Sequence, residues 1–122
     1  MTRIAAFVFA LLIGTVSTGH AAAIIGKPAP ALELRDVDGK TVRLDAFKGK
    51  YVVLEWVNFQ CPFVGKHYGS GNMQRLQEKY TEEGVVWLSI CSSAPGKQGY
   101  VTGPEANAEM KERGAADRKS VV

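Results

Sequence analysis

A continuous apolar strand that leads into a cysteine and a proline constrains this chain more than any other feature. Residues 52–57 are apolar at almost every position, which is typical of a strand buried on both faces at the centre of a parallel sheet. Cys61 and Pro62 follow after a short connection. Proline suits the first turn of a helix, because its fixed φ fits and its missing N–H would have no partner there. The sequence therefore predicts that Cys61 lies at a helix N-terminus, where the helix dipole favours the nucleophilic thiolate.

The residues after Cys61 have the pattern of a βαβ unit. A short helix is expected to run to about Tyr68, and a second helical stretch follows it. That stretch carries one apolar stripe made of Met73, Leu76 and Tyr80. Residues 85–90 then form a second apolar strand. This order predicts two parallel strands joined by a right-handed crossover.

The flanking segments predict a hairpin, a helix and a tail. Residues 32–34 and 42–44 alternate in polarity around Asp38 and Gly39, which indicates two half-buried strands and a tight turn. Pro104–Arg113 has the pattern of a helix, with proline in its first turn and a glycine just after its end. The last residues have no pattern that predicts an element.

The first 23 residues have the three parts of a secretory signal peptide. Met1–Arg3 is basic, Ile4–Val16 is mainly apolar, and Ala21–Ala23 supplies small residues for cleavage. The apolar run is short for a membrane span, although a membrane anchor or an amphipathic first helix is the alternative. We therefore expect export across the inner membrane, a mature chain that begins at Ile24, and a periplasmic location. Contact with the membrane is expected only during export.

Charge and cysteine spacing argue against a nucleic-acid partner and against a zinc site. The formal net charge is +3, and the basic residues lie among acidic ones without a basic stripe, so we expect no nucleic-acid partner. The chain has two cysteines, Cys61 and Cys91, whose spacing fits no zinc site. No metal and no cofactor is therefore expected. An oxidising compartment would allow the two cysteines to pair, but neighbouring strands do not guarantee the short distance that a disulfide needs.

Four segments resemble the redoxin branch of the thioredoxin-like superfamily, which includes AhpC/TSA (peroxiredoxin-like) proteins and exported TlpA-like thiol oxidoreductases. These segments are residues 26–30, 38–40, 44–50 and 56–62. The resemblance implies an α/β, thioredoxin-like fold with an N-terminal hairpin and a βαβ core. It places a partial redoxin domain at residues 24–114 and leaves 115–122 as an irregular tail.

The chain departs from the superfamily in three ways. Val64 stands where thioredoxin-type enzymes have the second cysteine of Cys-x-x-Cys, so a dithiol cycle within that motif is excluded. Leu54 and Asn58 stand where peroxiredoxins have proline and threonine. Superfamily members also continue into a strand hairpin that opens with a cis-proline, and this hairpin is absent from the chain. We therefore expect that the sequence is a truncated or minimal form of the domain.

The resemblance implies roles for a few residues. Cys61 is the expected attacking thiolate, and Pro62 and Asn58 are the expected supporting residues. Cys91 is either a resolving cysteine or a small core residue, and the second interpretation is the stronger.

His67 is expected to face solvent, because six residues of helix turn it about 120° away from Cys61. Glu55 is the one charge in the central strand, and a buried carboxylate must be paired or protonated.

These expectations favour an exported thiol-dependent oxidoreductase with a single attacking cysteine. Its substrate is either a peroxide, which would leave a sulfenic acid, or a protein disulfide, which would leave a mixed disulfide. An external thiol reductant or a thioredoxin-like protein would regenerate the enzyme. One alternative is a copper-handling protein, for which only Cys61, Cys91, His67 and Met73 are available and their spacing supports no site. An inactive fragment or binding module is the other alternative.

Overall fold

The computed structural model describes residues 23–115, 120 and 121. The chain divides into two compact units, Met1–Pro30 and Ala31–Val122. The predicted signal peptide, apart from Ala23, lies outside the described residues. Within the described ranges, no helix has both the length and the hydropathy that a membrane span needs.

The second unit begins with the predicted hairpin. Strands β1 (Glu33–Arg35) and β2 (Thr41–Arg43) pair antiparallel, with Leu34 opposite Val42. These two side chains are half-buried while their strand neighbours are exposed, as the alternating pattern predicts. A 3₁₀ helix, η1 (Leu44–Phe47), follows β2 directly.

A parallel sheet forms the centre of this unit. Strand β3 (Val52–Trp56) pairs parallel with β4 (Val86–Ile90), which confirms the predicted parallel pair. Strand β5 (Ser120–Val121) pairs parallel with the other edge of β4, so the sheet order is β3-β4-β5. Within the tail that the sequence predicts as irregular, these two residues thus pair with β4.

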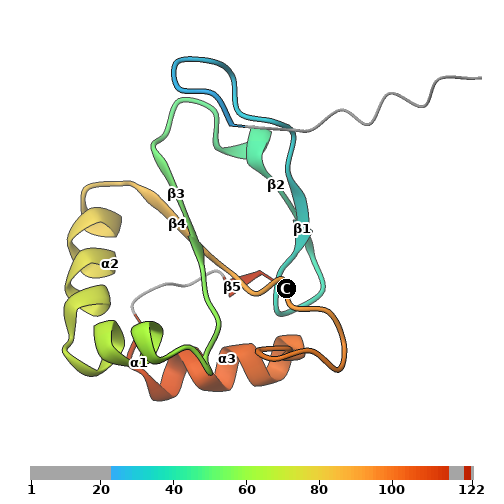
Figure 1. Cartoon of the computed structure of the whole chain (residues 1–122). Helices are drawn as coiled ribbons and strands as arrows, with labels where there is room; N and C mark the ends of the chain where they lie inside the picture. Colours follow the sequence, from blue (N-terminus) through green and yellow to red (C-terminus); the bar gives the residue numbers. More distant parts are fainter. Residues whose placement is uncertain (1–22, 116–119, 122) are drawn as a thin grey trace, which may run out of the picture. The chain divides into compact units, whose positions relative to one another are not determined.

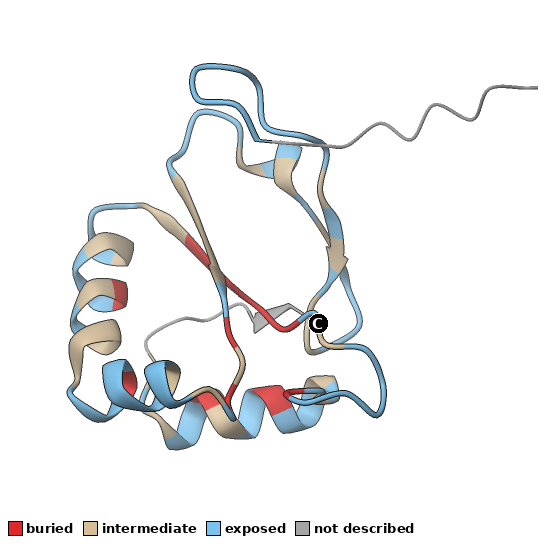
Figure 2. Cartoon of the chain, viewed as in Figure 1, coloured by how far each residue is buried: buried red, intermediate tan, exposed pale blue. Residues whose placement is uncertain are grey.

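The prediction that β3 is buried on both faces is also wrong. Its residues are half-buried and Trp56 at its end is 59% exposed, whereas Trp87–Ile90 of β4 are buried. Position in the sheet explains the contrast, because β4 has a paired strand on each side and β3 has one among the described residues. Figure 2 shows this difference along the two strands.

Three α-helices lie among the described residues of this unit. The chain enters α1 (Pro62–Gly69) shortly after the end of β3, turns into α2 (Asn72–Glu82), and returns through β4 (Figure 1). Pro62 is the first residue of α1, as predicted. Helix α3 (Gly103–Glu112) follows the loop after β4.

A capping box fixes the start of α3. The Glu105 carboxylate accepts hydrogen bonds from the backbone N–H and the hydroxyl of Thr102, both at 2.7 Å. These two bonds hold the pKa of Glu105 below its ordinary value, and the bond from the Thr102 backbone N–H has the larger effect. The loop after β4 therefore joins α3 in a defined geometry.

The main hydrophobic core lies where the carboxyl ends of β3 and β4 meet the helices. Residues that follow the two strands pack there with the inward faces of α1 and α3 (Figure 2). The buried members of this core are Val57, Phe59, Tyr68, Cys91, Ala106 and Met110. The segment that carries Cys61 thus borders this core, because Val57 and Phe59 of the same connection belong to it.

Candidate functional site

A tight turn delivers Cys61 from β3 to α1. The backbone N–H of Cys61 donates to the carbonyl oxygen of Asn58 at 2.9 Å. The N–H of Gln60 donates to the side-chain Oδ1 of Asn58, also at 2.9 Å, which is the geometry of an Asx turn. Asn58 is one of the expected supporting residues, and its amide oxygen shapes the turn that places the cysteine.

Cys61 is the N-cap residue of α1. Its backbone is extended, with φ −79° and ψ 126°, and its carbonyl accepts the first helical hydrogen bond from Gly65 at 3.1 Å. Pro62 follows it in the first turn. The cysteine is half-buried, and hydrogen bonds hold its backbone in place. A thiol at this position lies at the positive end of the helix dipole.

Cys91 lies in a very different environment at the end of β4. It is 7% exposed and packs in the main hydrophobic core. Burial, and secondly the negative charge of Glu55, raise the pKa of Cys91 to about 11. Both cysteines are free thiols. The structure thus favours the small-core-residue interpretation of Cys91 over a resolving role.

The contrast between the two thiols predicts a large difference in alkylation rate. A thiol with a pKa of about 11 is ionised to roughly one part in ten thousand at pH 7, and burial further blocks the reagent. We expect iodoacetamide to label Cys61 at least about tenfold faster than Cys91 in the native protein. Site-resolved mass spectrometry measures both rates. In denaturant the two rates should converge, and equal rates in the native protein would contradict this assignment.

Glu55 is the centre of a polar cluster beneath the helices. Its carboxylate accepts hydrogen bonds from Trp87 Nε1 at 2.8 Å, the Tyr68 hydroxyl at 3.1 Å, Gln77 Nε2 at 3.2 Å and Ser89 Oγ at 3.3 Å. We call these five residues the Glu55 cluster. The sequence indicated that this charge would need partners, and the cluster supplies them.

The Glu55 cluster joins the sheet to two helices. Ser89 lies opposite Glu55 in the β3–β4 register, Tyr68 comes from α1 and Gln77 from α2. Gln77 is 0% exposed and also donates to the Tyr68 hydroxyl at 2.9 Å. Sequence reasoning missed these donors because they are scattered over three elements. The one available signal was the polar Gln77 within the helix whose apolar stripe faces the sheet.

The residues considered for a copper site lie in separate environments. His67 is exposed, as predicted, and its Nδ1 lies 3.4 Å from Asn72 Nδ2. Met73 packs against the main core, which also contains Cys91. Within the described part of the chain, no group of three or more His, Cys, Asp or Glu residues could hold a metal ion.

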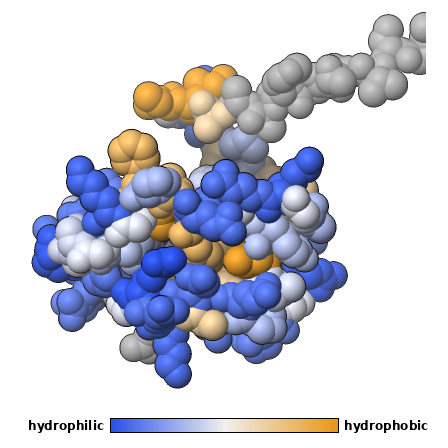
Figure 3. Space-filling view, turned by 60° about the horizontal axis from the view of Figure 1, so that its bottom comes forward, coloured by the Kyte–Doolittle hydropathy of each residue, from blue (hydrophilic) through white to orange (hydrophobic). Residues whose placement is uncertain are grey.

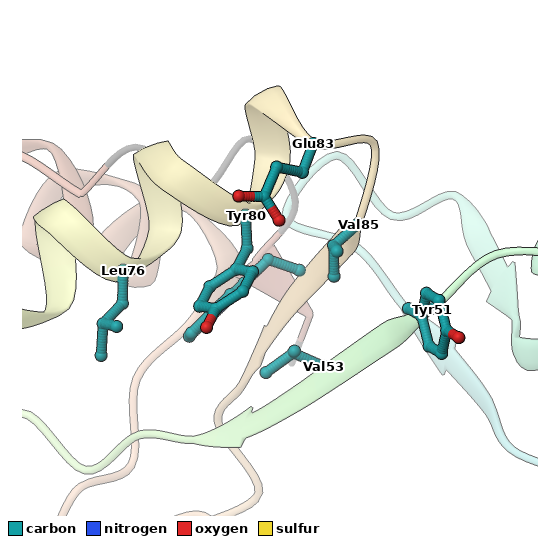
Figure 4. Close-up of a pocket in the computed structure, with 7 residues that line it drawn as sticks. Tyr51, Val53, Leu76, Tyr80, Glu83 and Val85 are labelled. Carbon is teal, nitrogen blue, oxygen red and sulfur yellow. The ribbon is translucent and has the colours of Figure 1, made fainter.

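Two concavities are lined by residues other than Cys61. An apolar pocket of about 480 Å³ opens between α2 and the starts of β3 and β4 (Figure 4). It is lined by Tyr51, Val53, Leu76, Tyr80, Glu83, Val85 and Trp87. A smaller polar pocket of about 280 Å³ lies beside the end of α1, lined by Gly65, Tyr68, Gly69, Glu112 and Arg113. Cys61 lines neither pocket.

The surface that carries α1 and α3 is mainly hydrophilic, with hydrophobic residues visible near its middle (Figure 3). Two large aromatic side chains near Cys61 in the sequence are exposed, Trp56 at 59% and Phe63 at 69%.

Comparison with known proteins identifies a family and a fold. Residues 25–102 match the AhpC/TSA family. The chain is 30% identical to glutathione peroxidase 7 of Arabidopsis thaliana chloroplasts, over 76% of this chain and 37% of that protein. It is also 30% identical to the chloroplast phospholipid hydroperoxide glutathione peroxidase 1 of the same plant, over 78% of this chain and 38% of that protein. The chain thus spans less than half the length of these curated relatives.

Solved structures show the thioredoxin-like fold. The thioredoxin domain of a thiol-disulfide oxidoreductase from Bacteroides vulgatus matches with a TM-score of 0.59 and 19% identity, over 82% of this chain and 64% of that one. A hypothetical protein from Sinorhizobium meliloti matches with a TM-score of 0.67 and 21% identity, over 82% of this chain and 54% of that one. The α/β, thioredoxin-like fold class expected from the sequence is confirmed.

Proposed function

The chain belongs to the AhpC/TSA family, and from that premise we propose that it is an exported thiol-dependent oxidoreductase whose single attacking cysteine is Cys61. One observation carries the proposal: Cys61 is only half-buried and lies at the N-cap of a helix, while Cys91 is buried with a raised pKa. Only one of the two thiols is therefore placed to react.

Reduction of a peroxide is the reaction that we favour. The Cys61 thiolate attacks one peroxide oxygen, the O–O bond breaks, and the other oxygen leaves as an alcohol or water after taking a proton. The sulfur is oxidised to a sulfenic acid. The two curated relatives reported above, both named glutathione peroxidases, support this choice.

Regeneration of Cys61 then requires an external thiol. A first thiol condenses with the sulfenic acid and releases water, which leaves a mixed disulfide. A second thiol attacks that disulfide, frees the Cys61 thiolate and leaves as the external disulfide. Cys91 is a poor internal alternative, because burial disfavours its thiolate. A low-molecular-weight thiol or a thioredoxin-like protein is the partner that this cycle needs.

Exchange with a protein disulfide is the second candidate. Cys61 would attack one sulfur of the substrate and form a mixed disulfide, which an external thiol would then resolve. Exposure of Trp56 and Phe63 supports this candidate, because aromatic side chains offer contact area to a polypeptide. Val64 in the second-cysteine position means that the resolving thiol is external here too.

Turnover with two substrates separates the candidates. The protein is mixed with an excess of a small thiol and either hydrogen peroxide or a protein disulfide, and consumption of each substrate is followed. We expect the protein to consume peroxide, at a rate that saturates as the peroxide concentration rises. Turnover of the disulfide alone would favour exchange, and turnover of neither substrate would contradict an oxidoreductase.

Export is supported by the signal-peptide pattern of residues 1–23. Expression of the full chain in a Gram-negative host, followed by N-terminal sequencing of the periplasmic fraction, tests it. We expect a mature chain that begins at Ile24, and an Ala23→Asp variant that is not processed. An uncleaved chain confined to the cytoplasm would contradict export.

A further inference from the structure

The backbone of Gly99 packs against the turn that delivers Cys61. Gly99 lies in the loop between β4 and α3, is buried, and has a φ of +78°. A Cβ added there would lie 2.5 Å from both Cγ and Oδ1 of Asn58 and 2.6 Å from Nδ2. The N–H of Gly99 also points at the turn and donates to Gln60 Oε1 at 3.3 Å.

Both contacts fall on the residues that shape the turn. Asn58 accepts the hydrogen bonds from Gln60 and Cys61 that close the turn, and Gln60 immediately precedes the cysteine. A segment nearly forty residues downstream therefore touches the two side chains that set the position of Cys61. Any side chain at position 99 would have to push Asn58 out of the turn or push the loop away from Gln60.

We propose that Gly99 is a positioning residue for Cys61, which acts by letting the loop after β4 lock the Asn58–Cys61 turn against α1. The absence of a side chain at position 99 is what allows Asn58 to keep its Asx-turn bond. With that turn closed, Cys61 stays at the N-cap of α1, and its sulfur keeps one fixed position for reaction. The consequence for turnover rests on the proposed function, but the effect on thiol reactivity does not.

Gly99→Ala tests the proposal, with Gly96→Ala as its matched control. Gly96 lies in the same loop with a φ of +75°, but a Cβ there would meet nothing within 4 Å. Both variants therefore force alanine into left-handed backbone, and only Gly99→Ala collides with Asn58. We expect iodoacetamide to alkylate Cys61 about 3- to 10-fold more slowly in the Gly99→Ala protein, and within about twofold of wild type in the control.

A second background keeps the test valid if Gly99→Ala alone folds poorly. Asn58→Ala removes the three atoms with which the new Cβ would collide. Adding Gly99→Ala to Asn58→Ala should then change the Cys61 alkylation rate by less than about twofold, because the two changes act on one contact. Far-UV circular dichroism and the cooperativity of thermal unfolding establish that each variant is folded.

Three results would overturn the proposal. One is a Cys61 rate in folded Gly99→Ala that equals or exceeds that of wild type. Another is an equal slowing in Gly96→Ala. The third is a slowing by Gly99→Ala that persists in the Asn58→Ala background. Alkylation needs no peroxide or disulfide substrate, so a failure here is distinct from a failure of the proposed function.

Discussion

Replacement of Cys61 by serine is expected to lower kcat/KM for the thiol-dependent reaction by at least about a thousandfold. The hydroxyl of serine is not ionised at neutral pH and cannot form a sulfenic acid or a mixed disulfide. The replacement is nearly isosteric at a half-buried N-cap, where serine is itself a favoured residue. Stability should therefore change little, and loss of turnover would report on chemistry. Steady-state kinetics with peroxide and an external thiol provide the measurement.

Cys91→Ala is the matched control for this experiment. Cys91 is a buried core residue, so its replacement should lower the free energy of unfolding by about 1–2 kcal/mol through lost packing. Turnover should stay within about threefold of wild type, because the cycle recovers through an external thiol. Turnover that survives Cys61→Ser and disappears in Cys91→Ala would reverse the assignment of the two cysteines.

Replacement of Glu55 by alanine is expected to lower the free energy of unfolding by about 2–4 kcal/mol. Trp87, Tyr68, Gln77 and Ser89 all donate to this carboxylate, and all four are buried. Each of these donors loses its acceptor in the alanine variant. The hydrogen bonds that join α1 and α2 to the sheet are lost as well. Urea unfolding followed by tryptophan fluorescence measures the change.

Two controls separate the cluster from a general effect of removing charge. Glu55→Gln keeps one acceptor oxygen for the cluster and should lose about half as much free energy. Glu82→Ala removes a carboxylate from the exposed end of α2 and should change the free energy of unfolding by no more than about 0.5 kcal/mol. An alanine variant at position 55 that unfolds at the same urea concentration as wild type would show that the Glu55 cluster does not stabilise the domain.

Local signals in the sequence predicted most of the fold. The hairpin and the helix that begins at Pro62 each follow from a pattern within a few adjacent residues, and the parallel pair follows from the order of two apolar runs with helical segments between them. The position of Cys61 at a helix N-terminus follows from its neighbour Pro62 in the same way. These features are predictable because alternation, proline and an apolar run act over short distances.

Features that depend on distant partners were not predictable. The apolar run in β3 indicates burial on both faces, but Trp56 is exposed, because β3 has a paired strand on one side only among the described residues, which only the strand order reveals. The contact between Gly99 and Asn58 joins segments far apart in the chain, and glycine carries no side chain to signal it. Glu55 was recognisable as a charge that needs partners, but the identity of those partners required the packing of three elements.

Trapping of a sulfenic acid tests most directly the claim that Cys61 is the attacking thiol. The reduced protein is treated with one equivalent of hydrogen peroxide in the presence of dimedone, and the adduct is mapped by peptide mass spectrometry. We predict an adduct at Cys61 in wild type and in Cys91→Ala, and no adduct in Cys61→Ser. An adduct at Cys91, or peroxide consumption that continues undiminished without Cys61, would contradict the account.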